Sequence, residues 1–265
     1  MRKLVTIVTI VTIVTTVIAV TVETAAAEPP KAHDIVEAAD RARNPQKPFR
    51  VTSTLVDYVQ GKAPERGVVL AIHAKFDGKN GQYRNLVRYM GPPRDTGKLV
   101  LLDASKMWFY DPASKSSVRI SPQQRLTGQA SDGDVLTVNL AHDYTAKLVG
   151  EETVKDADRA ERTTWHLDLT AATGDAMYNH LEYWVEKDSY RAIKGKFYSD
   201  SGRVLKIAYY RKFQEVLGGV RPTETVIIDA VDTNLVTTVT STDFHEQDIP
   251  DAWFQRDYLP RVTED

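Results

Sequence analysis

Residues 176–210, AMYNHLEYWVEKDSYRAIKGKFYSDSGRVLKIAYY, decide the fold that the sequence predicts. This stretch contains three β-type runs, separated by the turns EKDSYR (186–191) and SDSGR (199–203). Apolar and polar residues alternate within the runs with a period of two, the pattern of strands that bury one face. Gly202 can take a positive φ in the second turn. The spacing predicts antiparallel hairpins.

The same pattern extends in both directions along the chain. Upstream runs such as FRVTSTLVDYV (49–59) and GVVLAIHAKF (67–76) are also short, and turns rich in glycine and proline follow them. No helical pattern lies between successive runs, which argues against βαβ units. We therefore predict a mainly β (α+β) fold with one antiparallel sheet of about 10–11 strands, and so many twisted strands should curl.

One run, KMWFYDP (106–112), is apolar on both faces. A strand exposed on one side should alternate, so a packed layer, a partner or a ligand must cover each side here. We expect the covers to be a helix over 34–43, capped by Asp34, and the long insertion at 121–144. The insertion is either a functional lid or a plain surface connection. The tail DIPDAWFQRDYLP (248–260), with a short helix capped by Asp251, should dock over one end of the sheet.

The N-terminus has the three parts of a secretory signal peptide. MRK is positively charged, residues 4–22 are apolar, and Ala25 and Ala27 fit an Ala-x-Ala cleavage site. We expect residues 1–27 to be removed and 28–265 to form one domain, although the apolar run is long enough to remain as an anchor. The expected location is the periplasm of a two-membraned bacterium.

The sequence offers little that could carry catalysis. The chain has no cysteine, and its six histidines lack the spacing of a zinc site. His166 and Asp168 share one face of a strand and are an acid–base pair or, more commonly, exposed neighbours. A net charge of −2 gives no electrostatic case for nucleic acid. We predict a protein that is not an enzyme and has no cofactor, no metal and no nucleic-acid partner.

What remains is an excess of apolar surface on the inner faces of the predicted sheet. These side chains either pack as solid core or line a pocket for a chain-like apolar ligand. The candidate cavity residues are Trp108, Tyr110, Trp165, Leu167, Leu169, Tyr183, Val185, Leu205, Ile207 and Tyr209.

The order of the motifs resembles a known family. DYTAKLVGEETVKDADR, WHLDLTA, the stretch 176–210, LGGVRPTETVIIDA and IPDAWFQRDYLP follow the pattern of the outer-membrane lipoprotein-sorting proteins, the LolA/LolB-like superfamily. The likeness runs from about Phe49 to Leu259 and is to a larger, less characterised branch. It implies an unclosed β-barrel wrapped over a few short helices, with an apolar cavity that accepts acyl chains.

This resemblance implies a function as well as a fold. We expect a monomeric periplasmic carrier, or chaperone, that binds a lipid or an acylated lipoprotein and takes part in lipoprotein transport. The cargo would come from an inner-membrane exporter and move toward the outer membrane. The first alternative is a lipid-sensing regulatory protein of the same fold, partnered with an inner-membrane protein or exporter. The second is a periplasmic hydrolase, which would need a buried carboxylate or histidine with a shifted pKa in the cavity.

Overall fold

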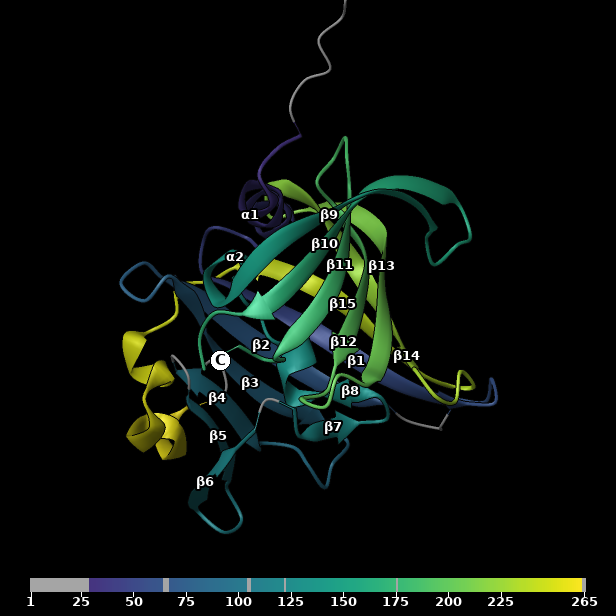
Figure 1. Ribbon diagram of the computed structural model, residues 1–265. Coiled ribbons are helices and arrows are strands. Elements are labelled where there is room, and N and C mark those ends of the chain that lie inside the picture. Colours follow the sequence, from purple (N-terminus) through teal and green to yellow (C-terminus); the bar gives the residue numbers. More distant parts are fainter. Residues whose placement is uncertain (1–28, 64–66, 104–105, 122, 175, 264–265) are drawn as a thin grey trace, which may run out of the picture.

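The computed structural model describes residues 29–63, 67–103, 106–121, 123–174 and 176–263. The predicted leader, 1–27, lies outside the described residues. The main feature is one antiparallel sheet of 13 strands that curves strongly without closing, which confirms the predicted fold class (Figure 1). In spatial order its strands are β6 (Ser116–Ile120), β5 (Lys106–Asp111), β4 (Leu99–Asp103), β3 (Gln82–Gly91), β2 (Val68–Asp77), β1 (Phe49–Val59), β15 (Leu235–Glu246), β14 (Gly219–Asp229), β13 (Val204–Val216), β12 (Ala192–Tyr198), β11 (His180–Glu186), β10 (Glu161–Ala171) and β9 (Tyr144–Lys155).

The sheet has more strands than the sequence predicted. Strand β6, SSVRI, forms one edge of the sheet, where it is mostly exposed and needs no alternating apolar pattern. Two further strands, β7 (Arg125–Thr127) and β8 (Ala130–Ser131), form a separate hairpin inside the insertion. Their few residues are too short for a period of two to be recognised.

The predicted covers lie on the concave side of the sheet. Helix α1 (Ala32–Arg43) contacts β9, β11 and β14, and it also contacts α2 (Leu140–Asp143) in the insertion. The insertion also contains the 3-10 helix η1 (Asp132–Val135), which precedes α2 in the chain. We call residues 123–143 the cover segment. Its buried residues share the main core with α1 and the inner faces of the strands.

A second, smaller core explains why KMWFYDP is apolar on both faces. Met107 and Phe109 pack with the main core, whereas Trp108 and Tyr110 point to the other side of the sheet. There the tail forms two 3-10 helices, η2 (Asp251–Phe254) and η3 (Arg256–Arg261), over β3–β5 (Figure 1). Trp253, Phe254 and Leu259 bury themselves in this second core. Docking of the tail on the sheet is confirmed.

Two predicted helix caps are corrected by the structure. Helix α1 begins at Ala32, two residues before the expected cap, so Asp34 lies in its first turn, where an acidic side chain favours the helix dipole. Pro250 precedes η2, and Asp251 is its first residue. Instead of capping, the Asp251 carboxylate accepts hydrogen bonds from Lys75 Nζ and Arg84 Nη2, both at 2.8 Å.

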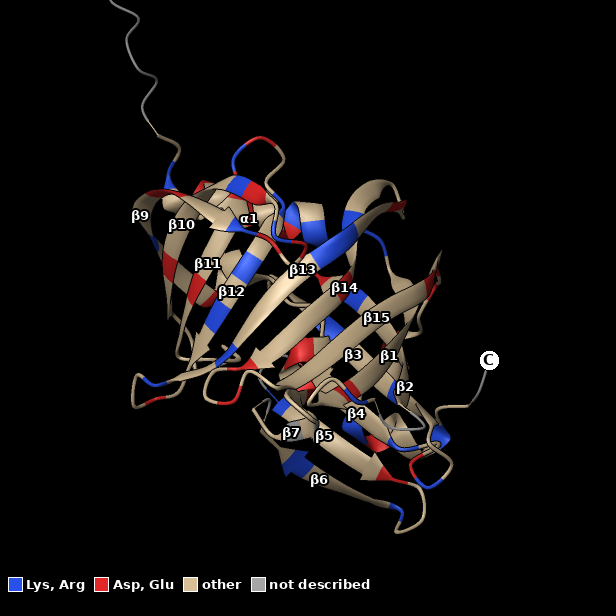
Figure 2. Ribbon diagram, turned by 90° about the vertical axis from the view of Figure 1, so that its right-hand side faces the viewer, with Lys and Arg blue, Asp and Glu red and all other residues tan. Residues whose placement is uncertain are grey.

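Charged residues of both signs are spread over the outer surface of the sheet (Figure 2). Within the part of the chain that the structure describes, no helix is long and apolar enough to cross a membrane.

Candidate functional site: a covered cavity

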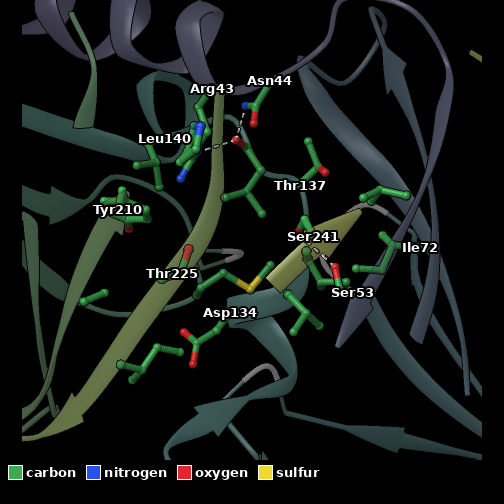
Figure 3. A pocket seen from close by; sticks show the side chains of 18 of the residues that line it. Arg43, Asn44, Ser53, Ile72, Asp134, Thr137, Leu140, Tyr210, Thr225 and Ser241 are labelled. Atoms are coloured by element: carbon green, nitrogen blue, oxygen red, sulfur yellow. Dashed lines mark hydrogen bonds between the residues drawn. The ribbon is translucent and has the colours of Figure 1, made fainter. Parts of the chain in front are cut away.

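A cavity of about 180 Å³ lies between the concave face of the sheet and its covers. Residues of α1 and the loop after it, the cover segment and strands from both halves of the sheet line it (Figure 3). Apolar side chains such as Leu181, Ala208 and Ile227 form much of the wall. An engineered apolar cavity of about 150 Å³ can bind benzene, so this one has the volume for a small apolar group in its closed form.

Polar bonds from the C-terminal end of α1 hold one end of the cover segment. Arg43 Nη2 and Asn44 Nδ2 both donate to the Val138 carbonyl oxygen, at 2.9 and 2.8 Å (Figure 3). Asp40 accepts from the Ala141 backbone N–H at 2.8 Å and from Arg43 Nη2 at 2.9 Å. This group of bonds joins α1 to the cover segment beside the apolar side chains that both contribute to the main core.

Side-chain amides on β3 hold the middle of the cover segment. Asn85 is fully buried, and its amide donates to the Thr137 carbonyl at 2.9 Å and accepts from the Thr137 N–H at 2.9 Å. Gln82 accepts from the Asn139 N–H at 2.6 Å. The two side-chain amides form the hydrogen bonds that a neighbouring strand would otherwise supply. They give partners to the backbone N–H and C=O groups of Thr137 and to the N–H of Asn139.

A buried ion pair lies toward the other end of the cavity. Lys206 of β13 pairs with Asp134 of η1, and these side chains are only 6% and 8% exposed. The Tyr178 hydroxyl donates to the second oxygen of Asp134 at 2.9 Å. Figure 3 shows Asp134 on the side of the pocket opposite Arg43 and Asn44. The cavity therefore has a cation near each end.

The Asp132 carboxyl and the Tyr183 hydroxyl are two further polar groups that are buried in or beside the cavity. Burial, with a smaller contribution from the nearby Asp134 charge, raises the pKa of Asp132 to about 7. The Tyr183 hydroxyl lines the cavity and has no hydrogen-bond partner among the described residues. A buried hydroxyl without a partner costs free energy, so a polar group or water entering the cavity would be favoured there.

The buried carboxyl group of Asp40 should make stability depend on pH. Burial, partly offset by Arg43, raises its pKa from 3.8 to about 6. The folded chain then binds more protons than the unfolded chain between those values, so this group stabilises the fold at low pH and loses that contribution as pH rises through 6. We expect the free energy of unfolding to fall by about 2 kcal/mol from this group between pH 4 and pH 6.5.

Urea denaturation across this pH range measures the effect by comparing wild type with Asp40→Asn. The free energy of unfolding of wild type minus that of Asp40→Asn, plotted against pH, should fall over this range. The other titrating groups are common to both proteins and cancel in the difference. Asp34→Asn, an exposed change on the same helix, should follow wild type. Parallel curves for Asp40→Asn and wild type would show that Asp40 does not titrate in this window.

A second cavity, of about 310 Å³, adjoins the first. It lies between the β7–β8 hairpin, the start of β13 and the turn after β14, and its lining includes the polar residues Arg203, Ser131 and Asp229. Lys206 and Tyr178 line both cavities. Together the two volumes fall within the range of ordinary ligand pockets, about 300–1,000 Å³.

The structure brings the predicted cavity residues together only in part. Tyr183 lines the first cavity, while Trp165, Leu167, Leu169 and Val185 are buried in the main core around it. Trp108 and Tyr110 lie in the second core, and Leu205 lines the second cavity. Ile207 and Tyr209 are partly exposed and alternate with residues that line the first cavity, which places them on the outer side of the sheet.

Strand register explains where the structure places these residues of β13. Directly opposite residues share a face, and Tyr183, Gly195 and Ala208 are opposite one another across β11, β12 and β13. The cavity face of β13 therefore carries Lys206, Ala208 and Tyr210, the less apolar set. Arg43, Asn44, Tyr178 and Asp134 were also missed, because they lie far apart in sequence.

His166 and Asp168 do not form the acid–base pair that the sequence left open. His166 stacks on Trp184 with ring centroids 4.4 Å apart and lies between Glu152 and Glu182, whereas Asp168 pairs with His180 at 3.1 Å. His166 and Asp168 are thus separate cross-strand partners on the outer face. Among the described residues, no group of three or more acidic or histidine side chains could hold a metal ion.

Comparison with known proteins agrees with this architecture. A LolA superfamily protein from Nitrosomonas europaea is 29% identical, with a TM-score of 0.76 over 87% of this chain and 100% of that one. A DUF1329 family protein from Desulfovibrio piger is 20% identical, with a TM-score of 0.72 over 86% and 97%. A Vibrio parahaemolyticus domain described as an outer membrane lipoprotein-sorting protein is 17% identical, with a TM-score of 0.71 over 87% and 98%. The last two show the likeness of fold alone.

A family model with the description "Uncharacterized protein" matches residues 81–261, well over half of the chain. No curated protein matches the sequence. The chain belongs to the family of that model, and it has the fold of the LolA superfamily protein from Nitrosomonas europaea.

Proposed function

We propose that this protein is a periplasmic carrier that binds an acyl chain of a lipid or lipoprotein and moves it toward the outer membrane. The observation that carries the proposal is the covered cavity: apolar walls closed by a segment that a few polar side chains hold. Each buried methylene of an acyl chain contributes about 0.8 kcal/mol, so even part of a chain is bound firmly. The likeness to lipoprotein-sorting proteins supports the same role.

Loading requires the cover segment to move. The first cavity, at about 180 Å³, is smaller than the pockets that ordinary ligands fill. Opening exchanges the bonds from Arg43, Asn44 and Asn85 for bonds to water and also exposes the apolar side chains that the cover segment contributes to the main core, a cost that a bound acyl chain would offset. Opening would expose the apolar wall to an incoming chain, and closing would shield that chain from water.

The remaining parts of the proposal follow from the carrier role. Residues 1–27 act as a cleaved signal peptide, and 28–265 form the single carrier domain. The protein works as a monomer, receives cargo from an inner-membrane exporter and performs no catalysis. Arg43 and Lys206, the cations of the cavity, are both engaged in ion pairs rather than poised as acids or bases.

The proposal is tested on protein purified from the periplasm under gentle conditions. Native mass spectrometry, followed by extraction of bound molecules, should find a lipid or an acylated protein on a chain that starts at residue 28. The purified protein should also take up a fluorescent fatty acid. An empty protein that fails to take up the fatty acid would contradict the carrier role, and a tight complex with an inner-membrane domain would favour a sensor.

A further inference from the structure

Lys206 is a buried ammonium group at the boundary between the two cavities. The residue is 5% exposed, and the rings of Tyr178 and Phe197 lie 5.1 and 5.8 Å from its Nζ atom. Phe197 is its direct cross-strand partner on β12. Burying an ammonium group among such side chains is costly unless an anion and hydrogen-bond acceptors surround it.

The cover segment supplies those acceptors. Within the described chain, Lys206 Nζ pairs with Asp134 and donates to Ser131 Oγ at 3.2 Å and to the Gln129 carbonyl at 3.5 Å. All three belong to residues 129–134. Arg43 differs, since it pairs with Asp40 in its own helix. Movement of the cover segment therefore removes the polar partners of Lys206 and leaves Arg43 its carboxylate.

The two cavities differ in character on either side of Lys206. Leu181, Ala208 and Ile227 give the first an apolar wall. The second has a polar lining in which the cation Arg203 accompanies Lys206, opposed by the single carboxylate of Asp229. In the first cavity, Asp40 pairs with Arg43 and Asp134 pairs with Lys206, so its two cations are balanced. The second cavity favours a ligand that brings negative charge once Asp134 withdraws from Lys206, because Arg203 and Lys206 then outnumber Asp229.

We propose that the cargo is an anionic amphiphile whose alkyl chain occupies the first cavity and whose carboxylate or phosphate headgroup binds Lys206 from the second. This assignment rests on the proposed carrier function and narrows its ligand. The headgroup replaces Asp134 as the partner of Lys206. Its negative charge balances the Lys206 ammonium, which loses Asp134 when the cover segment opens. Opening of the cover segment and capture of the ligand are thereby linked.

The test uses three probes with the same twelve-carbon chain: dodecanoate, dodecyl phosphate and the neutral dodecanol. Calorimetric titration of the full mature protein should give affinities for one or both anions about 10- to 100-fold above the alcohol, the worth of a hydrogen-bonded charge. The anion bound more tightly distinguishes a fatty acid from a phosphate-bearing lipid. Lys206→Met should bind all three probes alike, at the affinity of the alcohol.

Two further variants sharpen the result. Asp134→Asn removes the competing carboxylate and should bind the anions more tightly than wild type without a gain for dodecanol. Lys196→Met is the matched control, because Lys196 adjoins Phe197 on β12 and contacts Trp184 and Glu182 on the outer face. It should keep the wild-type preference.

The outcomes separate the two proposals. Equal binding of all three probes by wild type would overturn the headgroup assignment and leave the carrier function standing. The assignment would also fail if Lys206→Met kept the preference for anions. If Lys206→Met does not fold, Asp134→Asn decides instead, and an affinity for the anions no higher than that of wild type would overturn the assignment. Binding of none of the probes would count against the carrier function itself.

Discussion

Replacing Ala208 with tryptophan should abolish uptake of an acyl chain while the protein still folds. Ala208 lies in the middle of β13, lines the first cavity and is 4% exposed. A tryptophan side chain there would occupy the space of about four methylene groups, a loss of about 3 kcal/mol of binding, which lowers affinity more than about 100-fold. Titration with a fluorescent fatty acid measures the loss.

Controls for this prediction lie on the same strand. Ile207→Trp, one residue away on the outer side, should bind as wild type does. Ala208→Leu fills less space and should give an intermediate affinity, which guards against misfolding of the larger variant. Circular dichroism and thermal unfolding confirm that each variant is folded. Full uptake by folded Ala208→Trp would mean that the chain binds elsewhere.

Replacing Arg43 with leucine should cause a large loss of stability that depends on pH. Arg43 pairs with Asp40, whose side chain is 8% exposed, and also donates to the Val138 carbonyl. The variant leaves a buried carboxylate without its cation, which costs about 3–5 kcal/mol at pH 8. At pH 5, below the pKa of about 6 that burial gives Asp40, the carboxyl is largely neutral, and the deficit should shrink to about 1–2 kcal/mol.

Urea denaturation at the two pH values gives both deficits. Arg41→Leu serves as the surface control, because its ion pair with Glu37 is more than half exposed and such pairs contribute up to about 1 kcal/mol. The double variant Asp40→Asn/Arg43→Leu should be less destabilised at pH 8 than Arg43→Leu alone, since no buried charge remains. A deficit that is the same at pH 5 and pH 8 would contradict the account.

The curved sheet could be predicted because its signal is local. Period-two alternation and turn residues appear in every hairpin of 176–210, and the two-faced run at 106–112 correctly required a layer on each side. It was harder to predict which residues of the run at 106–112 lie on each face of the sheet. Trp108 and Tyr110 are as apolar as Met107 and Phe109, so composition could not tell which pair joins the second core.

The cavity could not be predicted to the same extent, because it depends on long-range register and on polar side chains. Lys206 and Ala208 resemble an outer face in sequence, and only their position opposite Phe197 and Gly195 places them inside. Asp134 meets Lys206 across 72 positions of chain. A lysine and an alanine that alternate with large apolar residues in a strand are the signal that could have indicated an inner wall with space beside it.

The second core makes the two halves of the barrel mechanically unequal. Strands β3–β5 are held between the main core and the tail helices, whereas the outer face of β9, β11 and β12 carries a small apolar cluster of Val154, Trp184 and Ile193. The doubly packed half acts as the stiff frame to which Asn85 ties the cover segment. We expect the half without tail helices to be the more compliant wall, because fewer buried apolar contacts hold it when the cavity beneath it widens.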